Sequence, residues 1–317
     1  MSVAEQIRAE ARTSFSFEVM PPVRGAGLKG LFSMIDSLCE FGPEHINITT
    51  RRKEITYVEM PNGSFERRNV QTRPGTVAVA AAIRTRYNVN VVPHILCSGF
   101  SAEEIEYTLL DLQYLGITEL LLLRGDKGKD EVRFVPSEHG WRHALDLEKQ
   151  VNDFNKGKFL DGSQTTPPAN PFHYGVAGYP EKHEEALSME EDLYWLKQKV
   201  DAGADYVCTQ MFYDNSKFFS FVEQARALGI TVPIIPGIRP LSKLSQLRTL
   251  PNTFKISLPE ELLKEGAKCK DDNEARSLGI EWCVAQCREL IAQGVPCIHF
   301  YTISAVESVR QVAGQIY

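Results

Sequence analysis

The fold of this chain is decided by the stretch LGITELLLLRGD, residues 115–126. Gly116 supplies the left-handed residue that commonly follows a helix end. The apolar run that begins three residues later is typical of a parallel strand covered on both faces. The same junction of glycine and apolar run occurs four more times, at Gly42, Gly203, Gly229 and Gly294. The chain is therefore built from repeated helix-to-strand steps.

Apolar runs of this kind define the strands that we expect. There are eight, at 14–20, 45–50, 90–97, 119–125, 172–179, 206–212, 233–238 and 297–303. Amphipathic segments separate them, and two begin with capping boxes, Ser101 to Glu104 and Ser188 to Glu191. Strict alternation of eight strands with helices predicts an α/β fold, a (β/α)8 TIM barrel. We expect one catalytic domain over residues 1–317.

Composition excludes several classes of protein. The 317 residues are 43% hydrophobic and 24% charged, with a formal net charge of −6, as in an ordinary globular protein. This charge favours neither nucleic acid nor an anionic membrane as a partner. Residues 1–12 lack the apolar core of a signal peptide, so we expect a cytoplasmic protein. The seven cysteines form no C-x-x-C pair, and Cys283 and Cys287 are interpreted as small helix residues, so no metal is expected.

Polar residues at the ends of the predicted strands are the candidates for function, because side chains fill the middle of such a barrel. The candidates are Glu18, Thr49, His94, Arg124, Asp126, Tyr179, Gln210, Tyr301 and Thr302. Two long segments, 51–74 and 127–171, follow strands and are expected on the same catalytic face.

Glu18 is the strongest candidate, since it lies in the apolar run FSFEVMPP at 15–22. Burial there should raise its pKa and keep it able to donate a proton near neutral pH. The alternative is a structural carboxylate paired with an arginine.

The other candidates each have an ordinary structural alternative. Arg124-Gly125-Asp126 offers charges and a close backbone approach to a flat ligand, or it is a surface turn. His94 and Gln210 could contact a heterocycle, or they could be satisfied groups of the barrel core. The G-x-G-x-x-G match at 25–30 is separated from its strand by Pro21-Pro22, so we do not interpret it as a dinucleotide site. The sequence contains no HExxH, P-loop or GxSxG motif.

Seven segments at the strand ends together resemble one known family, methylenetetrahydrofolate reductase. They are FEVMPP at 17–22, VPHILC at 92–97, LLLLRGD at 120–126, YGVAGYPEKHEEA at 174–186, LKQKVDAGADYVCTQMFYD at 196–214, IIPGIRP at 234–240 and HFYT at 299–302. The match is ordered and spans nearly the whole chain. No segment remains for the regulatory domain of the eukaryotic enzymes, so the short bacterial type is expected.

The resemblance implies noncovalent FAD as cofactor and NADH or NADPH as reductant. By the same resemblance the FAD-contacting positions are Thr49, His94, Arg124, Gly125, Asp126, Ala177, Tyr179, His183, Asp192 and Lys199. The implied partners are small-molecule substrates and further copies of the chain in a homo-oligomer, with neither nucleic acid nor membrane.

The implied reaction is the reduction of 5,10-methylenetetrahydrofolate to 5-methyltetrahydrofolate, which supplies methionine synthesis, in a ping-pong mechanism. Glu18 matches the general acid that opens the folate ring, and Asp126 matches a carboxylate that stabilises the resulting cation. Gln210, Gln246 and Tyr301 match substrate-binding positions.

Three departures from the family pattern concern substrate contacts. Leu250 stands where some bacterial members have a stacking phenylalanine, and Ile303-Ser304-Ala305 stands where many members have Leu-Asn-Arg. The segment 51–68 is expected as a long basic loop, which is either solvated surface or a replacement for the missing arginine near the glutamate tail or an NADPH phosphate.

Three alternatives stay open on the sequence. One is another FAD-dependent barrel of the proline dehydrogenase kind, and another is a flavin-free folate-binding methyltransferase barrel. The third is a barrel without catalysis that serves as a ligand-binding or assembly module.

Overall fold

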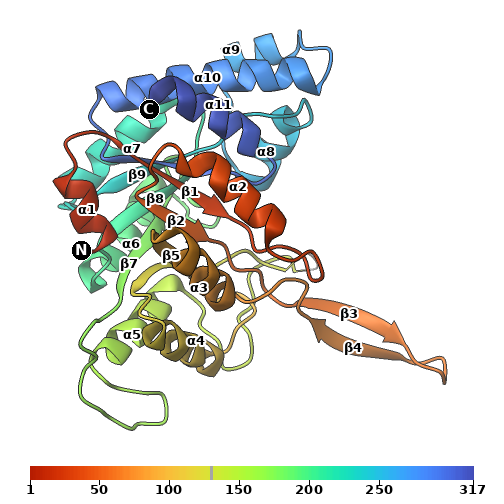
Figure 1. Ribbon diagram of the computed structural model, residues 1–317, viewed down its shortest axis with the longest axis vertical. Coiled ribbons are helices and arrows are strands. Elements are labelled where there is room, and N and C mark those ends of the chain that lie inside the picture. Colours follow the sequence, from red (N-terminus) through yellow and green to blue (C-terminus); the bar gives the residue numbers. More distant parts are fainter. Residues whose placement is uncertain (129–130) are drawn as a thin grey trace. The chain divides into compact units, whose positions relative to one another are not determined.

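The computed structural model describes residues 1–128 and 131–317 (Figure 1). All eight predicted strands are present within one or two residues of the expected limits. They are β1 (Ser14–Val19), β2 (His45–Ile48), β5 (Asn90–Leu96), β6 (Glu119–Leu123), β7 (His173–Gly178), β8 (Tyr206–Met211), β9 (Ile234–Ile238) and β10 (Cys297–Tyr301). They form a closed barrel in the order β1-β10-β9-β8-β7-β6-β5-β2. The predicted (β/α)8 barrel is confirmed.

The contacts of the chain group it into two compact units. The first unit holds residues 1–19, 34–47 and 173–317, and the second holds residues 20–33 and 48–172. In the first unit, parallel pairing joins β1 to β10, β10 to β9, β9 to β8 and β8 to β7. In the second unit β5 pairs with β6 in parallel. The single domain over 1–317 stays a prediction.

Helices alternate with the barrel strands as the glycine junctions predict. They are α1 (Val3–Ala9), α2 (Lys29–Cys39), α3 (Thr76–Tyr87), α4 (Ala102–Tyr114), α5 (Ala144–Asn155), α6 (Met189–Ala202), α7 (Asn215–Ala227), α8 (Gln246–Phe254), α9 (Glu260–Gly266), α10 (Asp272–Ala292) and α11 (Val306–Ile316). Within residues 1–128 and 131–317, no helix has both the length and the apolar character that crossing a bilayer requires.

The two predicted capping boxes differ in the structure. Ser101 and Glu104 exchange both side-chain hydrogen bonds at the start of α4, as predicted. At the start of α6 the Ser188 hydroxyl accepts from the amide of Glu191. The Glu191 carboxylate, however, accepts from the amide of Leu187, one residue before the cap, at 2.7 Å. The second capping box is therefore incomplete.

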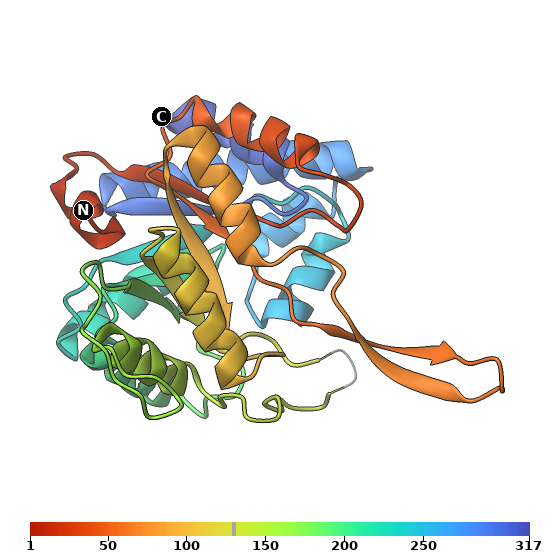
Figure 2. The same cartoon turned by 60° about the horizontal axis from the view of Figure 1, so that its bottom comes forward.

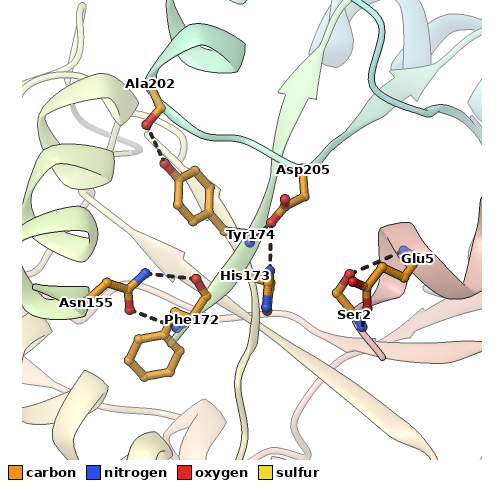
Figure 3. A network of polar contacts seen from close by, with 8 residues as sticks. All are labelled: Ser2, Glu5, Asn155, Phe172, His173, Tyr174, Ala202 and Asp205. Atoms are coloured by element: carbon orange, nitrogen blue, oxygen red, sulfur yellow. Dashed lines mark hydrogen bonds and ion pairs between the residues drawn. The ribbon is translucent and has the colours of Figure 1, made fainter. Parts of the chain in front are cut away.

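One carboxylate fixes the beginnings of strands β7 and β8, and Figure 3 shows it from close by. Asp205 precedes β8 and accepts hydrogen bonds at 3.2 Å from the backbone amide of Tyr174 and from the His173 ring. The Tyr174 hydroxyl donates to the carbonyl of Ala202 at the end of α6. These bonds hold the first residues of β8 in register with β7. The backbone that carries the site residues at the other ends of both strands is therefore fixed.

The segment after β2 differs from the loop that the sequence predicts. It contains an antiparallel hairpin of β3 (Glu54–Glu59) and β4 (Phe65–Val70) with six registered pairs. Alternation in EITYVE and the turn Pro61-Asn62-Gly63 are both hairpin signals that sequence analysis missed. Figures 1 and 2 show the hairpin projecting away from the other elements of its unit.

The other long segment, 127–171, contains the predicted internal helix as α5. Residues 129–130 of this segment lie outside the described residues. The segment ends at Phe172, whose amide and carbonyl are both hydrogen-bonded by the Asn155 side chain at the end of α5 (Figure 3). This pair ties the long segment to the entry of β7.

Candidate active site

In the first unit, Glu18 lies near the C-terminal end of β1, in register with Tyr301 of β10. The glutamate is 6% exposed. Its backbone carbonyl accepts a hydrogen bond from the hydroxyl of buried Thr302. Burial is the largest cause that raises the pKa values of Cys208 and Tyr301, and the charge of Glu18 also raises both. The three side chains are therefore close enough to interact. The raised pKa that we expect for Glu18 stays a prediction.

Tyr301 is held by a short chain of hydrogen bonds at the end of the barrel strands. Its hydroxyl donates to the carbonyl of Thr209 at 2.7 Å, and the Thr209 hydroxyl accepts from the amide of Gly237 at 3.0 Å. A Cβ at Gly237 would lie 2.6 Å from the Tyr301 ring and 2.2 Å from the Thr209 carbonyl. Burial raises the pKa of Tyr301 well above its usual value, so the phenol keeps its proton. Gly237 is therefore required for the position of the ring.

Gln210 lies at an irregularity of the sheet. The register between β8 and β9 shifts between Cys208 and Met211. Such bulges re-aim a side chain and are frequent beside active sites. The Gln210 side-chain oxygen accepts from the amide of Met211 at 2.9 Å. This bond fixes the amide so that its donor end is the group that Gln210 offers to a ligand.

Gln246 and Leu250 both lie on α8. Gln246 forms hydrogen bonds within the chain, and Leu250 packs in the core. The Gln246 amide oxygen accepts from the amides of Ser242 and Lys243 at 2.7 and 3.2 Å, which closes the loop after β9. Leu250 is 4% exposed and belongs to a buried cluster against which Tyr301 also packs. Leucine at position 250 is therefore part of the apolar cluster that borders Tyr301.

Predicted cofactor residues also meet at the end of β7 and on α6. The Tyr179 and His183 rings are in edge contact, with centroids 4.8 Å apart. The Asp192 carboxylate accepts from the amide of His183 at 3.1 Å, and Lys199 donates to the carbonyl of Ala177 at 2.7 Å. Burial raises the pKa of Asp192, while the His183 amide and the Lys199 charge act in the opposite direction. The structure thus brings these five predicted residues into one cluster.

In the second unit, Thr49 follows β2 and His94 lies in β5. The Thr50 hydroxyl donates to the carbonyl of His94 at 2.5 Å, which ties the two strand ends together. His94 is 6% exposed, and burial lowers its pKa to about 3, so its ring is neutral at physiological pH. A cavity of about 80 Å³ adjoins it, with Arg51 and Gln71 among its lining residues.

The Thr49 hydroxyl provides a test of whether a ligand is needed here. The oxygen is buried and has no hydrogen-bond partner within the described chain. A buried hydroxyl without a partner is costly, and a ligand with polar edges would supply the missing bond. Together with the neutral His94 ring, it fits the polar edge of a flat heterocycle such as a flavin.

The Arg124-Gly125-Asp126 turn after β6 is fixed by Ser98. The Ser98 amide donates to the carbonyl of Arg124 at 2.9 Å, and its hydroxyl donates to that of Asp126 at 2.7 Å. Gly125 has a φ of +80°, and a Cβ there would lie 2.9 Å from the Ser98 Cβ. The Arg124 guanidinium lies 4.8 Å from the centroid of the Phe134 ring. Glycine is required, and the Asp126 side chain is exposed.

The basic residues after β2 divide into paired and unpaired groups. Arg52 forms an ion pair with Glu131 at 3.1 Å, and Lys53 forms one with Glu104. Arg51 has no carboxylate partner among residues 1–128 and 131–317, and it lines the cavity beside His94. The basic segment is thus partly neutralised by the protein itself, which the sequence pattern did not indicate.

Three residues of the site's supporting structure were not predicted from the sequence: Ser98, Thr209 and Gly237. A glycine inside a strand often marks close approach of another group, so Gly237 in IIPGI could have been identified from sequence. The roles of Ser98 and Thr209 depend on strands that are remote in sequence, and no local pattern indicates them.

Comparison with known proteins identifies the family of this chain. The family model described as methylenetetrahydrofolate reductase matches residues 3–316. "Methylenetetrahydrofolate reductase (NADH) 1" of Arabidopsis thaliana is 32% identical, over 97% of this chain and 49% of its own length. "5,10-Methylenetetrahydrofolate reductase" of Escherichia coli K12 is 28% identical, over 94% of this chain and 88% of its own. The chain thus spans about half the length of the plant relative and most of the bacterial one.

A solved structure has the same fold. It is an uncharacterized Clostridium thermocellum protein described as binding two copies of 5-methyl-5,6,7,8-tetrahydrofolic acid. The match has a TM-score of 0.60 at 13% identity, over 99% of this chain and 98% of the other. At this identity the likeness concerns the fold alone. The family model spans nearly every residue and contains each strand end described above, so the chain belongs to the methylenetetrahydrofolate reductase family.

Proposed function

We propose that this chain reduces 5,10-methylenetetrahydrofolate to 5-methyltetrahydrofolate, with FAD as cofactor and NADH or NADPH as reductant. The observation that carries the proposal is the buried Glu18 carboxylate at the strand end, in a chain that matches the family over residues 3–316. A buried acid at a strand end is a group that can donate a proton to a substrate bound there.

FAD would supply the hydride carrier between the nicotinamide and the folate. In the second unit, Thr49, His94 and the Arg124-Gly125-Asp126 turn are the residues that would hold it. The Thr49 hydroxyl, which has no hydrogen-bond partner among the described residues, and the backbone at Gly125 support this assignment. In the first unit, the residues that would contact it are Ala177, Tyr179, His183, Asp192 and Lys199.

The residues of the chain suggest a division of labour in the folate step. Glu18 would donate a proton to N10 of the folate, so that the C–N10 bond of the five-membered ring breaks and a 5-iminium cation forms. The carboxylate of Asp126 would stabilise this cation electrostatically. A hydride delivered to the iminium carbon completes the methyl group. Glu18 then takes a proton from solvent before the next turnover.

Tyr301 is not the proton donor in this proposal. Its hydroxyl proton is already donated to the Thr209 carbonyl at 2.7 Å, and its pKa is raised by burial. Its ring and its oxygen would instead bound the substrate position. Gln210 would read the pterin amide through its donor end, and Gln246 would position the loop after β9 while it contacts the substrate.

Cofactor identification and turnover test the proposal together. The purified chain should yield FAD by mass spectrometry. Its flavin absorbance should bleach with NADH or NADPH and should return when methylenetetrahydrofolate is added. FMN, or no flavin after reconstitution, would contradict the cofactor assignment. Reduction of the flavin by proline in place of NAD(P)H would favour the proline dehydrogenase kind of barrel.

The remaining expectations belong to the same proposal. The ping-pong order predicts parallel lines in double-reciprocal plots at several folate concentrations. A cytoplasmic location, a homo-oligomeric state and the absence of nucleic-acid binding complete it, and the net charge of −6 supports the last of these.

A further inference from the structure

One face of the β3–β4 hairpin is exposed and partly apolar. Residues directly opposite each other in an antiparallel pair project to the same side. The pairs Ile55–Asn69, Tyr57–Arg67 and Glu59–Phe65 therefore share one side, which we call the hairpin face. Ile55, Tyr57 and Phe65 are 42%, 65% and 66% exposed. Tyr57 and Phe65 are diagonal neighbours on this face, Tyr57 in the middle pair and Phe65 in the pair next to the turn.

A hairpin of this kind is incomplete as a folding unit. The sheet has two strands, so β3 and β4 are both edges. An isolated two-stranded hairpin is at best marginally stable in water, and it gains stability when one face is covered. Both views show the hairpin extending from the second unit without helices packed along it (Figures 1 and 2). Exposed aromatic side chains grouped on one face indicate an interaction site.

The charges of the hairpin face indicate what covers it. The face carries one acid, Glu59, and one base, Arg67, and neither forms a hydrogen bond or an ion pair with the rest of the described chain. A surface for nucleic acid or an acidic peptide would carry bases without the acid. One charge of each sign makes the face complementary to itself, which a two-fold contact requires.

We propose that the hairpin face binds the hairpin face of a second copy of this chain. A two-fold axis along the Tyr57–Phe65 diagonal lays each aromatic ring on its equivalent in the other copy. The same operation places each Glu59 over Arg67 of the other copy, so both ion pairs form at once.

The size of the face sets the strength of the contact. A stable interface buries about 800 Å² on each partner, and six side chains fall below this area. We therefore expect a weak dimer, with a Kd on the order of micromolar. The average mass of the protein in solution should rise from that of a monomer to that of a dimer across that concentration range. Added salt should weaken the dimer.

Sedimentation velocity of the full chain over a range of concentrations tests the apolar part of the contact. The Tyr57→Ser/Phe65→Ser variant should weaken self-association at least tenfold. The matched control is Tyr107→Ser/Tyr114→Ser, which removes two tyrosines from α4 in the same unit that are 70% and 89% exposed. The control should associate like the unmodified chain. All four positions are exposed, and near-ultraviolet circular dichroism would verify that each variant is folded.

A charge exchange tests the two-fold geometry separately. Glu59→Arg gives a face with two bases and Arg67→Glu gives a face with two acids, so each variant alone should be monomeric. An equimolar mixture of the two should associate again, because each face now meets its opposite. A chain that is monomeric at every concentration overturns the proposal. So does a dimer that the Tyr57→Ser/Phe65→Ser variant retains, or a mixture that stays monomeric while the unmodified chain associates.

Discussion

Two tyrosines in this protein show how surroundings decide what a side chain does. Tyr301, at the end of β10, donates to a strand carbonyl, packs over Gly237 and has its pKa raised by burial. Tyr57, on the β3–β4 hairpin, is 65% exposed and faces Arg67 across the strand pair. At the end of the barrel strands, an added atom would collide with its neighbours. The hairpin side chains are mostly exposed, so we expect the hairpin to tolerate substitution. The difference predicts where substitutions damage chemistry, where they damage folding and where they do neither.

The largest effect is expected at Glu18, near the end of barrel strand β1. Glu18→Gln keeps the size and hydrogen bonding of the side chain but removes the transferable proton. Reoxidation of the reduced flavin by methylenetetrahydrofolate should fall by roughly a hundredfold or more, the usual value of a positioned general acid. Flavin reduction by NAD(P)H needs no such acid and should stay within about tenfold.

Stopped-flow absorbance of the flavin measures both half-reactions separately. Similar losses in both would indicate a binding defect rather than a lost acid. Folate reoxidation near the unmodified rate would exclude Glu18 as the acid and make Asp126 the next candidate.

The second effect is on stability, at Gly237. Gly237→Ala places a methyl group 2.2 Å from the Thr209 carbonyl and 2.6 Å from the Tyr301 ring. Forcing these groups apart should cost about 1–3 kcal/mol of unfolding free energy, as for other overpacked sites. Urea unfolding would measure this loss. Gly30→Ala is the matched control, because no atom lies within 4 Å of its added Cβ, and a loss of equal size there would remove the steric explanation.

A smaller effect separates the two tyrosines themselves. Tyr301→Phe removes the bond to the Thr209 carbonyl and should cost about 1 kcal/mol of unfolding free energy. Tyr57→Phe removes an exposed hydroxyl and should change stability by less than about 0.5 kcal/mol. Tyr301→Phe should also keep the folate half-reaction within about tenfold, because its proton is already committed to Thr209. A hundredfold loss in that step would instead give the phenol a direct role in proton transfer.

The smallest effect concerns the basic residues after β2. Arg51→Ala should raise the KM for a polyglutamylated folate by a few-fold, more than for the monoglutamate, because exposed charges act weakly. Arg52→Ala should not distinguish the two substrates, since Arg52 is paired with Glu131 at 3.1 Å. Steady-state kinetics with both folates compares the variants. Equal changes for the two substrates in Arg51→Ala would remove these bases from the tail site.

The barrel was predictable from sequence because its signals are local. A glycine that ends a helix and an apolar run that follows it each depend on a few neighbouring residues, and their repetition limits the fold to a closed parallel sheet. The hairpin was missed, although its alternation and its Asn-Gly turn are local signals too, because the basic residues of the segment were interpreted as a loop. Charge therefore misled where periodicity would have been correct.

The sequence by itself determined the eight strands, the positions of Glu18, Gln210 and Tyr301 at strand ends, and the family. The tertiary structure decided which of these groups are free to act. The Tyr301 hydroxyl donates its proton to the Thr209 carbonyl, and the Gln246 oxygen accepts from its own loop. The Thr49 hydroxyl has no hydrogen-bond partner in the part of the chain that the structure describes. The physical reason is that hydrogen bonds and steric contacts can join residues that are remote in sequence. Whether each one forms depends on differences of a few tenths of an ångström in the distance between two atoms, which no local pattern encodes.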